Sequence, residues 1–181
     1  MRESLLFLIR ALSHLYLLLF LLRFIMQWIR ADFYNPLAQF IVKTTNPLIA
    51  PARKVIPATA RFDLPTLVVL ILLEVIVTWL LLYVASFPAT SSELAEYVLL
   101  RLVRRTLLLY FWTILVYVIL SWVSQGSRHP LTMMLAELNE PVLRQVRRVL
   151  PPISGLDLSP MLALVLIQAL SLAVRLPFAL R

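Results

Sequence analysis

The sequence predicts an all-α integral membrane protein, and three observations support this fold class. Apolar residues make up 61% of the chain and the mean hydropathy is +0.90, whereas a soluble domain is about 45–50% apolar. Charged residues reach only 14%, where about 25% is usual. The third observation is an internal duplication. A chain of this composition is suited to a bilayer rather than to a soluble core.

Four apolar runs are each long enough to form a helix across a hydrocarbon core about 30 Å thick. We predict transmembrane helices over residues 5–29, 64–85, 98–123 and 158–176. The runs lack the alternation of barrel strands, and a helix satisfies its own backbone groups within lipid. The first run has no small-residue cleavage site, so we interpret it as a retained helix rather than a signal peptide.

The second half of the sequence repeats the first when it is shifted by 94 residues, which places Trp28 on Trp122. Other identities include Pro36/Pro130, Pro47/Pro141, Arg53/Arg147, Pro57/Pro151 and Asp63/Asp157. This self-similarity predicts a first repeat over 1–87, a connector over 88–97 and a second repeat over 98–181. Two crossings return each repeat to its starting side. The copies are therefore expected to be parallel, related by a pseudo-twofold axis along the membrane normal.

Each repeat also contains a short amphipathic segment bounded by prolines. The segments cover residues 36–46 and 130–140, and at three turns each they are too short to span the membrane. We predict that both form interfacial helices, because proline favours the first helical position and the position just past a helix end.

Basic and acidic residues follow each interfacial segment. The basic residues suggest a docking surface for anionic lipid or for a partner's acidic face, and the alternative is membrane anchoring and topology only. These residues are Arg53, Lys54, Arg147 and Arg148. Asp63 and Asp157 open the second and fourth predicted spans. We predict that both are helix caps rather than ion ligands.

Polar residues within the apolar runs are costly in a bilayer and therefore suggest a function. They are Arg10, His14, Arg23, Glu74 and Gln168. One hypothesis is a proton or cation path through His14 and Glu74, with Arg23 as counter-charge. The alternative is a structural ion pair that fixes helix packing. Since Glu74 aligns with Gln168, a symmetric transport site is not preserved, which favours the structural role.

The remaining features exclude several classes of function. The chain has no cysteine and only two histidines and two glycines, so thiol chemistry is excluded and we expect no metal site, no cofactor and no enzymatic activity. The net charge of +8 comes from residues at the ends of apolar runs. That placement indicates contact with headgroups rather than with nucleic acid.

Two stretches, RFIMQWIRADFYNPLAQFIVKTTNPLIAPARKVIP and LSWVSQGSRHPLTMMLAELNEPVLRQVRRVLPPISGLDLSP, closely resemble the two repeats of the YggT family. The similarity covers nearly the whole chain, and DFYNP and SWVSQG are similar to the proteobacterial two-repeat form. Asn35 of the first repeat is replaced by His129 in the second.

The resemblance implies a multi-pass protein of the bacterial inner (plasma) membrane, linked to osmotic-stress tolerance. Relatives in plastids and cyanobacteria are linked to cytochrome b6 maturation, nucleoid organisation and cell-division gene neighbourhoods. The family offers no established catalytic residues. We expect an inner-membrane scaffold or assembly/biogenesis factor that acts through the basic, proline-bounded segments. The alternative is an ion or osmolyte transport component that uses Glu74 and His14.

The expected partners are the phospholipid bilayer, anionic lipids and a membrane-protein partner, with a homo-oligomer as a further option. Basic residues are more numerous beside the proline-bounded segments than near the termini. The positive-inside rule therefore predicts that these segments face the cytoplasm and that both termini lie outside.

Overall fold

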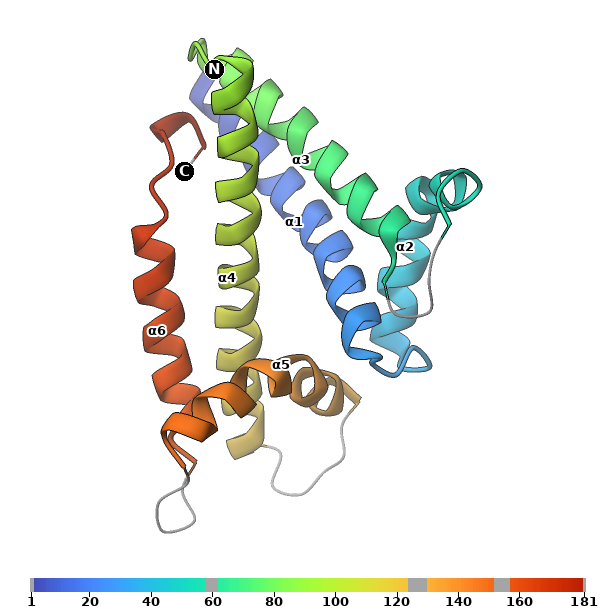
Figure 1. Cartoon of the computed structure of the whole chain (residues 1–181), viewed down its shortest axis with the longest axis vertical. Coiled ribbons are helices and arrows are strands. Elements are labelled where there is room, and N and C mark those ends of the chain that lie inside the picture. Colours follow the sequence, from blue (N-terminus) through green and yellow to red (C-terminus); the bar gives the residue numbers. More distant parts are fainter. Residues whose placement is uncertain (1, 58–61, 124–129, 152–156, 181) are drawn as a thin grey trace.

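A computed structural model describes residues 2–57, 62–123, 130–151 and 157–180. Over these residues the chain is all-α, without strands (Figure 1). The elements are α1 (Arg2–Ile29), α2 (Pro36–Arg53), α3 (Leu64–Ala85), α4 (Ser91–Val123), α5 (Pro130–Val149), α6 (Ser159–Ala173) and a 3-10 helix, η1 (Phe178–Leu180). His129, Gly126 and Gly155 lie outside the described residues.

The same order of helices occurs twice along the chain. In each half a long helix is followed by a helix set at an angle to it and then by a returning helix (Figure 1). The long helices pack mainly against the returning ones, α1 against α3 and α4 against α6. The two halves meet chiefly along α3 and α4. Both ends of the chain lie at the same end of the bundle.

The prediction that the proline-bounded helices end at residues 46 and 140 is wrong. Both α2 and α5 continue through their prolines, which are Pro47 and Pro51 in α2 and Pro141 in α5. Proline removes a helical hydrogen bond and crowds the preceding turn, but tertiary packing can offset that cost. Ile49 lies between Pro47 and Pro51, Leu143 follows Pro141, and the two side chains are almost completely buried, at 0% and 1% exposed. Their burial holds the second half of each helix in place.

Other boundaries also differ from the prediction. The connector over 88–97 is mostly helical because α4 begins at Ser91. Thr90 and Glu93 form a capping box there, in which the Thr90 N–H donates to Glu93 Oε2 (2.7 Å) and the Glu93 N–H donates to Thr90 Oγ1 (3.3 Å). Helix α1 begins earlier than predicted, and α6 ends at Ala173 rather than at residue 176. Helix α3 covers the predicted 64–85.

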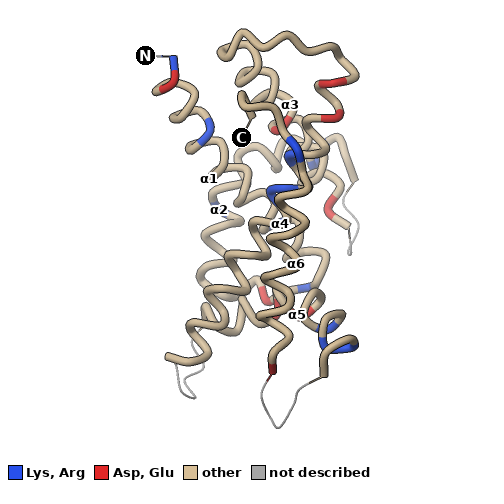
Figure 2. Tube along the Cα trace, turned by 90° about the vertical axis from the view of Figure 1, so that its left-hand side faces the viewer, with Lys and Arg blue, Asp and Glu red and all other residues tan. Residues whose placement is uncertain are grey.

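Of the helices that the structure describes, three (α1, α3 and α4) are long and apolar enough to cross a membrane. In the most apolar 18-residue stretch of α4 only 11% of the residues are buried inside the molecule, so most of its apolar surface needs another apolar environment. Charged residues gather in the upper part of the molecule and around α5, with a largely uncharged stretch between (Figure 2). Helix α6 has 15 residues and is about 22 Å long, so the fourth crossing stays a prediction.

Candidate functional site

A fully buried carboxylate lies between the two halves. Glu74 of α3 is 0% exposed, and it accepts from two arginines of α4. Arg101 Nε lies 2.6 Å from Glu74 Oε1, and Arg105 Nη2 lies 3.0 Å from Oε2 and 3.3 Å from Oε1. Both arginines are themselves buried. A carboxylate of the first half is thus neutralised by guanidinium groups of the second.

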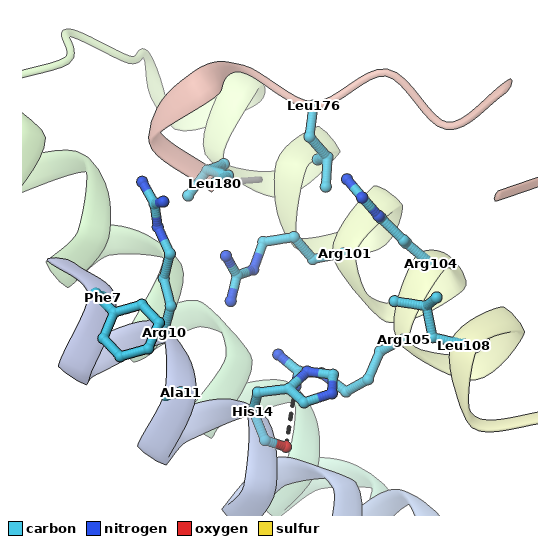
Figure 3. A pocket seen from close by; sticks show the side chains of 10 residues that line it. All are labelled: Phe7, Arg10, Ala11, His14, Arg101, Arg104, Arg105, Leu108, Leu176 and Leu180. Atoms are coloured by element: carbon cyan, nitrogen blue, oxygen red, sulfur yellow. Dashed lines mark hydrogen bonds between the residues drawn. The ribbon is translucent and has the colours of Figure 1, made fainter. Parts of the chain in front are cut away.

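His14 of α1 extends this network to a third helix. Arg105 Nη1 lies 2.9 Å from His14 Nδ1 and 3.3 Å from the His14 carbonyl oxygen, the contact that is dashed in Figure 3. Arginine has no acceptor. His14 Nδ1 therefore accepts, and the ring carries its proton on Nε2. The network joins α1, α3 and α4 through side chains.

A cavity of about 390 Å³ lies beside this network between α1 and α4 (Figure 3). We call it the cationic pocket, because its polar lining consists of Arg10, His14, Arg101, Arg104 and Arg105. Its other walls are apolar. Arg10 Nη2 donates to the carbonyl oxygens of Phe178 (3.2 Å) and Ala179 (3.0 Å), which attaches the C-terminal segment to α1.

A second arrangement repeats in the two halves. Arg53 Nη2 lies 2.7 Å from Asp63 Oδ2, and Arg147 Nε lies 3.0 Å from Asp157 Oδ2. We call these the matched ion pairs, because their positions correspond in the two repeats. Each pair connects the end of an angled helix, α2 or α5, to the start of the returning helix.

Comparison with known proteins identifies the family. The model of the CCB3/YggT family matches residues 3–84 and 96–178. The chain belongs to the CCB3/YggT family. Each matched segment of this CCB3/YggT chain contains one of the matched ion pairs.

Several relatives cover nearly the whole chain. A protein named "Uncharacterized protein YggT" from Escherichia coli (strain K12) is 41% identical over 95% of this chain and 89% of its own length. A Vibrio alginolyticus protein is 41% identical over 92% of this chain and 90% of its own length. A Pseudomonas aeruginosa protein is 36% identical over 93% of this chain and 86% of its own length. No solved structure gives a significant match.

The four predicted docking residues of this YggT-family chain divide into two kinds. Arg53 and Arg147 are engaged in the matched ion pairs. Lys54 and Arg148 are exposed, and Arg148 Nη1 donates to Gln145 Oε1 at 3.2 Å. In each half, an arginine paired with an aspartate is thus followed by an exposed cation that forms no ion pair with the described residues.

The two predicted caps differ in detail. Asp63 is the N-cap of α3 and accepts from the Thr66 N–H (3.4 Å) and from Thr66 Oγ1 (2.6 Å). Asp157 is not the N-cap of α6, because that helix begins two residues later, at Ser159. The extra residue of the Asp-Leu-Ser-Pro sequence displaces the helix start. Asp157 instead accepts from the Ser159 N–H at 2.9 Å.

The ionisation of Asp157 reflects these contacts. Partial burial opposes the charged form, but hydrogen bonds from Ser159 and Arg147, together with the positive charge of Arg147, hold the pKa of the Asp157 carboxyl below its usual value. Arg147 also donates to Glu140 Oε2 at 2.8 Å. The second matched pair is therefore part of a small surface network.

The structure brings together three of the five predicted intramembrane polar residues, Arg10, His14 and Glu74. Arg23 is not the counter-charge of Glu74, so that expectation is wrong. It lies further along α1 where α2 packs, and its Nη1 donates to Thr45 Oγ1 (2.7 Å) and Asn46 Oδ1 (3.1 Å). Gln168 is exposed on α6 and does not line the pocket.

Three arginines of the site were not predicted to belong to it: Arg101, Arg104 and Arg105. They precede the most apolar part of their helix, where basic residues commonly only anchor a span. A signal was nevertheless present, because their spacing of three and four residues places them on one helix face. A guanidinium-rich face of this kind needs acidic partners, and the one carboxylate in an apolar run was Glu74.

Proposed function

We propose that this chain is an inner-membrane scaffold or assembly factor that acts through a basic surface in each half, formed by Lys54 and Val55 in the first half and by Arg148 and Val149 in the second. The observation that carries the proposal is the pair of matched Arg–Asp contacts. They fix the ends of α2 and α5 and leave the next two side chains exposed in both halves. Val55 is 84% exposed and Val149 is 80% exposed.

The chemistry of the basic surface fits the headgroup region of a bilayer. A cation beside an exposed apolar side chain binds where acyl chains meet anionic headgroups, and also binds the acidic face of a protein embedded there. The proposal includes four crossings in two parallel repeats, with α2 and α5 at the interface. In this arrangement local thinning of the bilayer accommodates the short α6. A link to osmotic stress belongs to the same proposal.

The contacts of Glu74 support a structural role over transport. A carboxylate that carries protons or cations has to release its partners during each cycle. Glu74 is fully buried and held by Arg101 and Arg105, and removing a partner from such a group is costly. The network is well suited to holding the two halves in a fixed relation, which a scaffold requires.

Charge reversal at the exposed cations tests the proposal. We expect the Lys54→Glu/Arg148→Glu variant to insert and fold normally but to lose most of its co-purifying partner after crosslinking in native membranes. The reason is that a like-charge contact replaces an attractive one. Quantitative mass spectrometry of affinity-purified samples measures the loss.

Arg2→Glu/Arg175→Glu is the matched control, because it changes the net charge equally at exposed positions elsewhere in the fold. It is expected to keep the partner. The proposal is wrong if both double variants retain the same co-purifying proteins as the unmodified chain.

Membrane orientation gives a separate prediction. The chain has no cysteine, so single cysteines can be labelled without background. In spheroplasts, an impermeant maleimide is expected to label Ala89→Cys, in the α3–α4 connection, but to label Tyr34→Cys only after permeabilisation. Both positions are exposed. The reverse pattern would contradict the cytoplasmic placement of α2 and α5.

A further inference from the structure

We propose that the cationic pocket binds the phosphate group of an anionic phospholipid. This site is separate from the basic surface and does not depend on it. Among the described residues, four guanidinium groups line the pocket while one carboxylate, Glu74, neutralises part of their charge. Partly buried cations without counter-charges are unfavourable. A bound anion would therefore stabilise the guanidinium groups of the pocket.

Hydrogen-bond donors in the pocket outnumber the acceptors that the described residues supply. Arg101 reaches Glu74 through Nε, and its two terminal nitrogens have no hydrogen bond with the described residues. Arg104 has neither a hydrogen bond nor an ion pair with them. Arg10 Nε and Arg105 Nε are buried and have no hydrogen-bond partner in the part of the chain that the structure describes. Figure 3 shows the side chains of Arg10, Arg101 and Arg104 directed toward the same space.

Guanidinium groups match phosphate oxygens in geometry as well as in charge. A planar guanidinium donates two parallel hydrogen bonds to a phosphate, and such charge-assisted bonds are about twice as strong as neutral ones. The volume of about 390 Å³ lies within the roughly 300–1,000 Å³ typical of small-ligand sites. The pocket can hold a phosphate together with a small headgroup.

The apolar walls favour a lipid over a soluble anion. Phe7, Leu108 and Leu176 line the pocket beside the arginines, and Phe7 is 68% exposed. An acyl chain can pack against these apolar side chains, whereas a hydrated ion gains no binding free energy from contact with them.

The depth of the cationic pocket in the membrane also favours a lipid as its ligand. Trp28 and Trp122 are exposed near the C-terminal ends of α1 and α4, at the ends away from the pocket. Exposed tryptophans concentrate at membrane interfaces. Arg10 and Arg101 lie about 27–32 Å along the helices from these tryptophans. That separation is about the thickness of the hydrocarbon core, so the arginines reach the other headgroup layer.

Lipid titration of the purified chain in neutral detergent tests the proposal. The probes are dioleoyl phosphatidylglycerol, dioleoyl phosphatidylcholine, glycerol 3-phosphate and inorganic phosphate. Bound lipid is counted by native mass spectrometry and affinity is followed by thermal stabilisation. We expect phosphatidylglycerol to bind at one site per chain and the zwitterionic lipid to bind at least tenfold more weakly. In Arg104→Gln the dissociation constant for phosphatidylglycerol should rise about tenfold, since one charge-assisted contact is lost.

Arg104→Gln is chosen because Arg104 holds no other described residue, so the variant is expected to fold. Arg10→Gln is the second variant. Arg144→Gln on α5 is the control that should bind phosphatidylglycerol normally, because Arg144 does not line the cationic pocket. Equal affinity in Arg104→Gln, Arg10→Gln and the unmodified chain would overturn the site. If glycerol 3-phosphate or inorganic phosphate stabilises the chain as strongly as the lipid does, the lipid assignment is wrong.

Discussion

Replacing Glu74 with glutamine is expected to destabilise the protein more than any other single change at the site. The substitution leaves Arg101 and Arg105 buried without their counter-charge. Breaking a buried pair costs about 3–5 kcal/mol in soluble proteins, and an unpaired charge within a membrane helix costs about 3 kcal/mol. We expect the free energy of unfolding to fall by about 3 kcal/mol, measured by denaturation with sodium dodecyl sulfate in mixed micelles.

The repeat supplies a matched control for this experiment. Gln168 occupies the position equivalent to Glu74, but it is exposed on α6. Gln168→Leu is therefore expected to change the unfolding free energy by less than about 0.5 kcal/mol. A similar loss in Glu74→Gln and Gln168→Leu would mean that the Glu74 network does not hold the two halves together.

The second large effect is expected at the first matched ion pair, with a smaller one at its equivalent. Asp63 is fully buried and accepts from Arg53 and Thr66. Asp63→Ala removes the cap of α3 and leaves a buried Thr66 hydroxyl without its acceptor, at a combined cost of about 2–3 kcal/mol. The Asp157 side chain is 34% exposed, so water replaces its bonds and Asp157→Ala should cost about 1 kcal/mol or less.

The same denaturation assay compares the two alanine variants. Both remove one negative charge at equivalent positions of the repeat, so a difference between them reports burial rather than charge. Equal losses would contradict the view that the two pairs contribute unequally to stability.

The sequence predicts the membrane helices best where local chemistry marks both ends. Helix α3 covers its predicted residues because Asp63 caps the start and Ser86, with φ of 48°, ends the helix in the left-handed region. The ends of α2 and α5 were predicted wrongly because proline is a local signal. The burial of Ile49 and Leu143 is a property of the tertiary fold, and it outweighs that signal.

Half of the candidate site could be found from the sequence. His14 and Glu74 are conspicuous because charged or polar groups are rare within apolar runs. Their partners on α4 depend on how the two halves pack, which a comparison of the repeats does not reveal. Glu74 faces the other half across the α3–α4 contact, whereas α6 packs against α4 and α5 of its own half. Among the described residues the equivalent Gln168 consequently has no arginine partner, and the symmetry of the sequence does not extend to the ion pairs of Glu74.

The basic surface is tested most directly by site-specific photocrosslinking in native membranes. A photoreactive amino acid is placed at Val55 or at Val149, the exposed positions beside Lys54 and Arg148, and at Leu99 on α4 as an exposed control. The scaffold account predicts the same protein adduct from positions 55 and 149, absent from position 99 and lost when Lys54→Glu/Arg148→Glu is added. Adducts at 55 and 149 that match those at 99, or that survive the charge reversal, would contradict it.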